Sequence, residues 1–206
     1  IEGKEGDYAA EIHTLDTIAK ALRKERFDNG AINFSSSEVR FKLDENAVPI
    51  GIVVKESKDA HKLIEELMLL ANRFVATHVS KIHFKDKPLP FPYRIHDQPN
   101  EDKLALFAAF AAKFGYKLNL NSPESIATTF NEMLRQVQGK PEQHVLETLG
   151  IRTMSKAIYT IENIGHYGLG FENYCHFPSP IRRYPDVLVH RILFDVLNKK
   201  IQPLKG

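Results

Sequence analysis

Cysteine is almost absent from this chain of 206 residues, and the one cysteine is Cys175. A lone cysteine cannot form an internal disulfide, which excludes the disulfide-stapled scaffolds and favours a reducing compartment. No apolar run approaches the roughly 18 to 20 residues that span a bilayer, and the polar opening IEGKEGD is not a signal sequence. We therefore expect a cytoplasmic protein that does not enter a membrane.

An excess of charge of one sign is also missing. The chain has 28 lysines and arginines against 26 aspartates and glutamates, which leaves a net charge of +2. Charged residues make up 26%, close to the usual value of about 25%, so wholesale disorder and a histone-like chain are both excluded. A length of 206 residues with 43% hydrophobic content suffices for one globular domain with a sizeable core and is too short for two full-sized domains. Because the first residue is not methionine, we expect the chain to be a piece of a longer protein.

Most catalytic motifs are missing as well. There is no Gly-x-Ser-x-Gly motif, no phosphate-binding loop that ends in Gly-Lys-Ser or Gly-Lys-Thr, and no cysteine pair for zinc. None of the nine histidines lies two to four residues from another, which excludes the helical metal-binding pair. The ten aspartates are dispersed, and Asp97 and Asp102 are the closest pair, so no tight carboxylate cluster could hold Mg²⁺ by itself. The motifs therefore predict no complete active site.

Hydrophobic spacing predicts mostly helix. Apolar residues recur every three or four positions over much of the sequence. The predicted helices cover residues 7–27, 59–82, 100–114, 122–139, 141–161 and about 179–197. Alternating apolar residues predict a β-hairpin within 31–54 and a short strand at 93–96, and the stretch 162–178 is predicted to be an ordered loop. We therefore expect an α+β fold, a helix-rich body packed on a small mixed or antiparallel sheet.

A candidate phosphate site lies in the segment SPIRRYPD, residues 179–186. Ser179 as a helix cap, a proline in the first turn, and the adjacent Arg182 and Arg183 would place cationic groups beside the positive end of a helix. From residue 176 to 206 there are six lysines or arginines against two aspartates, a local excess of +4. The structural alternative is that one arginine pairs with a carboxylate such as Asp186 while the other is solvated.

An acidic pair stands in the first half of the predicted helix 59–82. Glu65 and Glu66 lie next to an apolar stripe, so one of them is expected at its edge. The stripe consists of Ile64, Leu67, Met68, Ala71, Phe74 and Val75. The alternative interpretation is a solvated acidic pair, since glutamate is normally exposed.

Two other places are candidates for substrate contact. The spacing puts Arg94 and His96 on the same side of the predicted strand 93–96, although decoration of an edge strand is the alternative. Phe34, beside three serines, could be a core residue or a platform for a stacked base. Single histidines such as His176 and His190 are expected to be hydrogen-bonded structural groups.

Five stretches of the sequence carry a family resemblance. The most specific is HFPSPIRRYPDVLVHRIL at residues 176–193. The others are FDNGAINF, DAHKLIEELMLLANRFVA, PYRIHDQPNEDKL and IENIGHYGLGFENYCHF. In order and approximate spacing, these stretches resemble the ribonuclease II and ribonuclease R family of exoribonucleases, and the Arg-Arg-Tyr-Pro-Asp form looks more like the ribonuclease R branch. The resemblance covers essentially the whole chain.

The resemblance implies a function and a place in a larger protein. Family members are processive exoribonucleases that degrade RNA from the 3′ end, release nucleoside 5′-monophosphates and use Mg²⁺ held by four aspartates. Those aspartates lie in the first part of the family's catalytic domain and have no counterpart here. Residues 1–206 are therefore expected to be the C-terminal portion of a ribonuclease II-type catalytic domain, to engage the 3′ end of single-stranded RNA, and to be inactive alone.

The resemblance also implies roles for individual residues. Arg182 matches the catalytic arginine at the scissile phosphate, and Glu65 or Glu66 matches a glutamate near the terminal ribose. Phe34 lies near the position of the aromatic that stacks on the last base. Pro178 is a departure, because the family usually has a hydroxylated residue there.

Together with the residue-based candidates, this gives a predicted substrate-binding set. The set comprises Glu65, Glu66, Arg183, Ser179, Arg94, His96 and Phe34. Two alternatives to the enzyme stay open. One is a non-catalytic RNA-binding or scaffolding homologue, and the other is a helical protein-interaction domain that has lost RNA binding.

Overall fold

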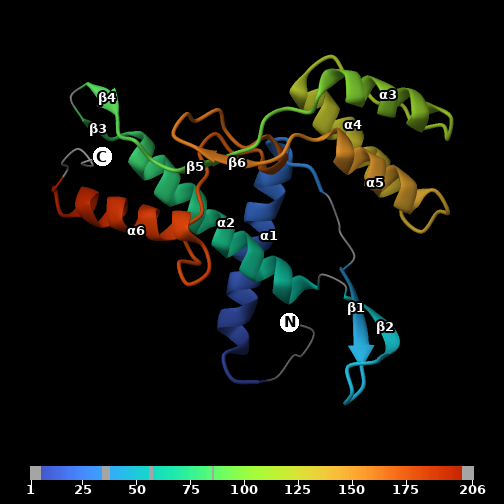
Figure 1. Cartoon of the computed structure of the whole chain (residues 1–206), viewed down its shortest axis with the longest axis horizontal. Helices are drawn as coiled ribbons and strands as arrows, with labels where there is room; N and C mark the ends of the chain where they lie inside the picture. Colours follow the sequence, from blue (N-terminus) through green and yellow to red (C-terminus); the bar gives the residue numbers. More distant parts are fainter. Residues whose placement is uncertain (1–5, 34–37, 56–57, 85, 201–206) are drawn as a thin grey trace.

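The computed structural model describes residues 6–33, 38–55, 58–84 and 86–200 (Figure 1). Its helices are α1 (Ala9–Asp28), α2 (Asp59–Ser80), α3 (Glu101–Ala112), α4 (Pro123–Gln136), α5 (Gln143–Thr153) and α6 (Tyr184–Leu197), with a 3-10 turn, η1, at Tyr167–Leu169. Its strands are β1 (Glu38–Leu43), β2 (Pro49–Lys55), β3 (His83–Phe84), β4 (Lys87–Pro88), β5 (Tyr93–Ile95) and β6 (Ile158–Thr160). The strands form three separate antiparallel pairs, β1–β2, β3–β4 and β5–β6. The predicted helix-rich α+β class is confirmed, with three small sheets in place of one.

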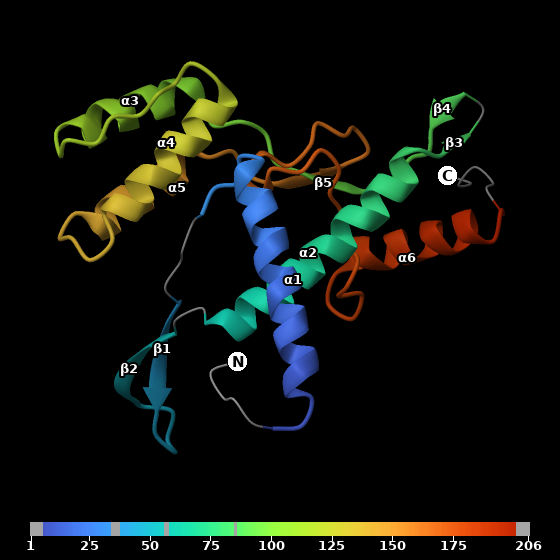
Figure 2. The same cartoon turned by 180° about the vertical axis from the view of Figure 1, so that it is seen from behind.

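The elements are spread along one long axis. Helices α3 to α5 and helix α6 lie toward opposite ends, and α1 and α2 cross between them (Figures 1 and 2). The loop that follows β6 packs on the C-terminal end of α1, where the N–H of Ile32 donates to Gly168 O at 3.0 Å. Gly170 is essential to this packing, because its φ is +66° and a Cβ there would lie 2.8 Å from Asn29 O. None of the described helices is both long and apolar enough to cross a membrane.

A buried ion pair joins α1 to α2. Glu66 is only 2% exposed and accepts hydrogen bonds from Arg26, which is 5% exposed. Nη1 of Arg23 lies 3.3 Å from the same carboxylate. A carboxylate buried without a partner would be costly, so these arginines allow the two helices to pack with a charge between them.

The buried face of α2 differs from the predicted apolar stripe. Its buried residues are Leu63, Glu66, Leu69, Asn72, Ala76 and Val79. Two members of the predicted stripe, Ile64 and Phe74, are 56% and 64% exposed. The prediction was wrong for these two residues, because two polar residues belong to the core face, whereas Val75 of the predicted stripe packs against a buried cluster. Glu66 is paired with arginine, and the Oδ1 atom of Asn72 accepts a hydrogen bond from the N–H of Phe177 at 2.8 Å.

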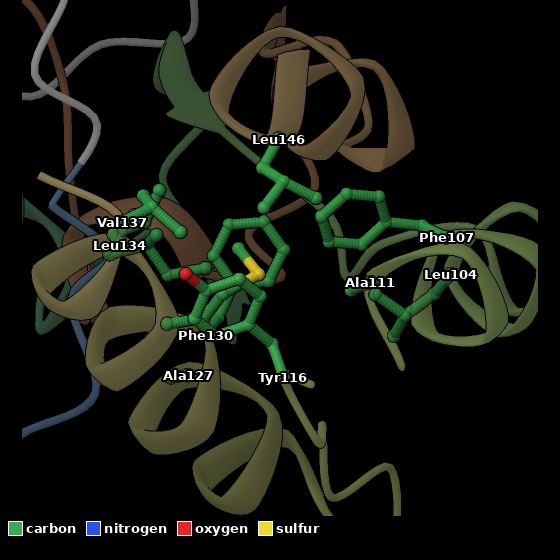
Figure 3. Close-up of a cluster of buried hydrophobic side chains, with 11 residues drawn as sticks. Leu104, Phe107, Ala111, Tyr116, Ala127, Phe130, Leu134, Val137 and Leu146 are labelled. Atoms are coloured by element: carbon green, nitrogen blue, oxygen red, sulfur yellow. The ribbon is translucent and has the colours of Figure 1, made fainter. Parts of the chain in front are cut away.

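Helices α3, α4 and α5 enclose a core of their own (Figure 3). Its central residues include Phe107, Phe130 and Leu146, and the two aromatic rings lie 5.5 Å apart between centroids. Helix α4 begins as predicted, because the Ser122 side chain accepts a hydrogen bond from the Ser125 N–H and Pro123 occupies the first turn. Helices α3, α4 and α5 are thereby held as one packed unit, which we call the α3–α5 lobe.

Residues 141–161 do not form the single helix that was predicted. Helix α5 ends at Thr153, and residues 158–160 form β6, which pairs with β5. Ile-Tyr-Thr is a β-branched and aromatic run that suits a strand, and the pairing satisfies backbone groups that a longer helix would have satisfied internally. The predicted strand at 93–96 is confirmed as β5, and the predicted hairpin is confirmed as β1–β2, although it begins only at Glu38.

Candidate phosphate-binding site

Residues 179–183 form a turn that precedes α6. The N–H groups of Arg182 and Arg183 donate to Ser179 O at 3.3 and 3.2 Å, and Arg183 is the N-cap of α6. Ser179 is therefore not the helix cap that the sequence predicted. The helix starts later because Pro185 occupies its first turn, where the fixed φ of proline suits the beginning of a helix.

Asp186 holds this turn from inside the protein. It is fully buried, and its Oδ1 accepts hydrogen bonds from the N–H of Ser179 at 2.8 Å and from Nη2 of Arg183 at 2.9 Å. Its Oδ2 lies 2.9 Å from Nε of Arg183. A buried carboxylate needs such partners, so Arg183 is committed to the fold. The alternative stated for the arginine pair therefore holds for Arg183.

Arg182, the neighbouring residue, is exposed. Within the part of the chain that the structure describes, its guanidinium has no carboxylate at ion-pair distance and no hydrogen-bond partner. The turn that carries it is fixed at Ser179 and at Asp186. Arg182 is thus a free cation on a rigid support, the property that a phosphate contact requires.

A second arginine stands on the β5–β6 pair. Arg94 is directly opposite Tyr159 in the strand register, and its Cζ lies 4.6 Å from the centroid of the Tyr159 ring. A guanidinium over an aromatic face is stabilised by the ring's negative face while its N–H groups stay available at the edges. Among the described residues, the Arg94 guanidinium has no carboxylate partner.

His176 connects the strand pair to the turn. Its Nδ1 and the Tyr159 hydroxyl are joined by a hydrogen bond of 2.6 Å. Burial lowers the pKa of His176 to about 4, with further lowering by the charges of Arg183, Arg94 and, to a smaller extent, Arg182. His176 is therefore neutral near pH 7, and it forms a hydrogen bond as expected for a structural histidine.

The charges around His176 do not cancel. Arg94, Arg182 and Arg183 all act on it, and the carboxylate that opposes them is Asp186, which is bonded to Arg183. Among the described residues, neither Arg94 nor Arg182 has a carboxylate partner, so both positive charges are unpaired. We refer to this group as the arginine site, which consists of Arg94, Tyr159, His176 and Arg182.

His96 and Arg94 have different surroundings, although both alternate with the buried Tyr93 and Ile95 as predicted. The His96 ring stacks on His166 at 5.0 Å, and its Nδ1 accepts a hydrogen bond from the N–H of Gly168 at 3.0 Å. Burial lowers the pKa of His96 below its usual range. The ring of His96 therefore contacts the loop 162–178. Of the predicted pair, Arg94 is the member that belongs to the arginine site.

A cavity of about 670 Å³ adjoins His96 and His166. Its wall includes three carboxylates, from Asp97, Glu124 and Glu172, and one arginine, Arg73. Arg73 is already paired with Glu25 at 3.0 Å. The charge of this cavity disfavours a phosphate, in contrast to the arginine site.

The two candidate glutamates, Glu65 and Glu66, differ in how far their side chains are exposed to solvent. Glu66 is occupied by the arginines of α1, whereas the Glu65 side chain is 48% exposed and its Oε1 lies 3.7 Å from Nη2 of Arg26. Glu65 is therefore the accessible carboxylate of the pair. Phe34, the predicted stacking residue, lies outside the described residues.

The described residues do not fit a magnesium site. No group of three or more His, Cys, Asp or Glu side chains in the described ranges is arranged to hold a metal ion. Burial raises the pKa of the Cys175 thiol to about 12, so this cysteine is a core residue and not an activated nucleophile. What the arginine site can do chemically is to bind an anion and neutralise its charge.

The sequence reasoning missed Tyr159 and the supporting role of His176. Tyr159 was placed in a helix, although the β-forming run Ile158-Tyr159-Thr160 was a local signal for a strand. No local signal places His176 beside Arg94, because the two are brought together by the strand pairing.

The chain matches known proteins over nearly its whole length. The RNB domain family model matches residues 1–199, and the chain belongs to this family. Its relatives include Ribonuclease R 1 of Lactococcus lactis, 42% identical over 88% of this chain, and Ribonuclease R of Aquifex aeolicus, 34% identical over 94%. The chain spans only 21% and 26% of the lengths of these two relatives.

Solved structures show the same fold. The apo form of Mycoplasma genitalium RNase R matches 98% of this chain with a TM-score of 0.82 and 27% identity, and this chain covers 31% of it. Yeast Ssd1, described as a pseudonuclease, matches 97% of this chain with a TM-score of 0.69 and 21% identity, and this chain covers 25% of it. The second likeness concerns the fold alone.

Proposed function

We propose that residues 1–206 are the C-terminal portion of the catalytic domain of a cytoplasmic, processive, hydrolytic exoribonuclease. It would degrade single-stranded RNA from the 3′ end and release nucleoside 5′-monophosphates. Membership of the RNB family and the ribonuclease R relatives support this reaction. Complexes of Mycoplasma genitalium RNase R with ribose-methylated single-stranded RNA and with double-stranded RNA support RNA as the ligand.

Arg182 is the observation in this chain that carries the proposal. Its guanidinium is exposed and unpaired within the described residues, on a turn that the buried Asp186 fixes. Placed at the scissile phosphate, it would donate hydrogen bonds to the phosphoryl oxygens and neutralise the negative charge that develops as the bond to the leaving group breaks. Donors held in place before the reaction cost no reorganisation at the transition state. Arg183 would support this role by holding the turn.

Glu65 is the carboxylate that we assign to the terminal ribose. Its side chain is 48% exposed, and a carboxylate there could accept a hydrogen bond from a 2′-hydroxyl. Such a contact is how a site distinguishes RNA from DNA. Glu66, with Arg23 and Arg26 bonded to it, would hold α1 against α2 beside this position.

Magnesium is the cofactor that we propose for the full-length protein. When bound, it would supply neutralising charge and activate the attacking water. Because the described residues offer no fitting ligand group for the metal, we assign this chain the arginine side of the site.

The test is a product analysis with the full-length protein. We expect single-stranded RNA labelled at its 5′ end to be shortened progressively from the 3′ end, with nucleoside 5′-monophosphates as the small product. The same strand made of DNA serves as the control and should be a poor substrate. Tight RNA binding without any mononucleotide release would instead favour the non-catalytic RNA-binding homologue.

A further inference from the structure

The feature that the proposed reaction does not use is Arg94 with its supports. Arg94 extends from the middle of β5, and Tyr159 extends from the middle of β6 directly opposite. The backbone N–H of Arg94 donates to Tyr174 O at 2.9 Å, so β5 is held by the segment around Tyr174 as well as by β6. A long cationic side chain is thus restrained at its base and along one face.

The aromatic support is itself held in place. The Tyr159 hydroxyl is bonded to Nδ1 of His176, and the two rings lie 5.6 Å apart in an edge-to-face arrangement. His176 in turn packs edge-to-face against Tyr174 at 5.7 Å. A tyrosine that is 39% exposed would otherwise be free to rotate, so these contacts fix the ring beneath the guanidinium.

The unpaired positive charges of the arginine site favour the binding of an anion. Arg94 lies over the Tyr159 ring, the Tyr159 hydroxyl is bonded to His176, and the turn that carries Arg182 begins at Ser179, shortly after His176 in the chain. Neither arginine has a carboxylate partner in the described part of the chain. Like charges that lie near one another without counter-ions repel, and this repulsion is relieved when an anion binds between or beside them. The cavity beside His96 is instead lined by the carboxylates of Asp97, Glu124 and Glu172 and by neither Arg94 nor Arg182, so this preference is local to the arginine site.

We propose that Arg94 binds a second phosphodiester of the RNA, next to the one at Arg182, and that Tyr159 is its positioning residue. This assignment deepens the proposed function and rests on it. Phosphodiesters repeat along the strand, so two fixed guanidinium groups would set the register in which the scissile bond meets Arg182. Arg94 contributes to binding in the ground state and the transition state alike, whereas Arg182 acts mainly on turnover.

The first test is the salt dependence of RNA binding by the full-length protein, measured in EDTA so that the strand is not cleaved. Arg94→Ala should weaken binding and flatten the slope of log Kd against log salt by about 0.7, the value for one phosphate contact on a single strand. Arg152→Ala, at an exposed arginine of α5, is the matched control for the loss of one charge and should leave the slope unchanged. An unchanged slope for Arg94→Ala would overturn the proposal.

The second test addresses Tyr159. Tyr159→Phe keeps a ring under Arg94 and should retain most of the affinity, whereas Tyr159→Leu removes the aromatic face and should resemble Arg94→Ala. In steady-state kinetics, both Arg94→Ala and Tyr159→Leu should raise KM with little change in kcat. Equal affinities for the Phe and Leu variants would show that Tyr159 does not position Arg94.

The outcome is separable from that of the proposed function. If the full-length protein releases mononucleotides but Arg94→Ala binds RNA like the wild type, the second phosphate contact is wrong and the exonuclease stands. If it releases no mononucleotides but RNA binding still depends on Arg94, the contact stands and the exonuclease is wrong.

Discussion

Arg182 and Arg183 are adjacent and chemically identical, yet Asp186 gives them different surroundings. The buried carboxylate binds Arg183 and the N–H of Ser179, and it leaves Arg182 on the outside of the turn. The sequence could predict that this segment is cationic and that one arginine could pair with Asp186. It could not predict which one, because that depends on where α6 begins.

Asp186→Asn should destabilise the chain. The amide keeps the size of the side chain but removes the charge that neutralises Arg183, and breaking a buried ion pair typically costs about 3 to 5 kcal/mol. Urea unfolding of residues 1–206 measures this loss. Asp195→Asn, at an exposed aspartate of the same helix, is the control and should have a much smaller effect. Equal stability of Asp186→Asn and the wild type would show that the carboxylate does not hold the turn.

Two partly buried histidines should make stability depend on pH. Burial and the neighbouring cations lower the pKa of His166 to about 3 and that of His176 to about 4. In the unfolded chain both would take up a proton below the ordinary value of about 6.5, so the unfolded state binds more protons in the interval between. We expect stability to fall as the pH decreases from about 6.5 toward 4. NMR signals of both rings that stay in the neutral form at about pH 5 would confirm the cause, and titration near 6.5 would contradict it.

At the scale of elements, most helices follow from the hydrophobic period, and the exceptions have physical reasons. β6 depends on pairing with β5, a contact between residues distant in the sequence. The buried face of α2 includes Glu66 and Asn72, which a hydrophobic pattern assigns to the surface. The arginine site could not be predicted from the sequence pattern for the same reason, because Arg94, Tyr159 and His176 meet only after β5 and β6 have paired.

Gly150→Ala should destabilise the α3–α5 lobe. Alanine in a helix is usually better than glycine by about 0.5 to 1 kcal/mol. Here a Cβ would lie 2.5 Å from Cζ of the buried Phe130 and 3.4 Å from Phe107, and overpacking of this kind costs about 1 to 3 kcal/mol. Thermal unfolding should therefore show a lower Tm. Combining the change with Phe130→Leu should recover part of the loss, and a higher Tm for Gly150→Ala alone would contradict the packing argument.

At the scale of the whole molecule, the chain contains a cationic site and the described residues contain no group that fits a metal. We therefore expect purified residues 1–206 to release no mononucleotides from RNA in the presence of Mg²⁺. They should still bind RNA weakly, with an affinity that falls steeply as salt is raised, since phosphate contacts dominate. Mononucleotide release by the chain alone, or binding that is insensitive to salt, would contradict this expectation.

The central claim is that Arg182 neutralises charge at the reacting phosphate, and turnover of Arg182→Ala in the full-length protein tests it most directly. We expect kcat to fall about 10² to 10³-fold, as for the loss of one preorganised donor, while RNA affinity largely survives. Arg182→Lys should recover only part of the rate, because an ammonium cannot reproduce the planar fork of a guanidinium. Wild-type turnover by Arg182→Ala, with Arg152→Ala as the matched control, would show that this arginine does not face the scissile phosphate.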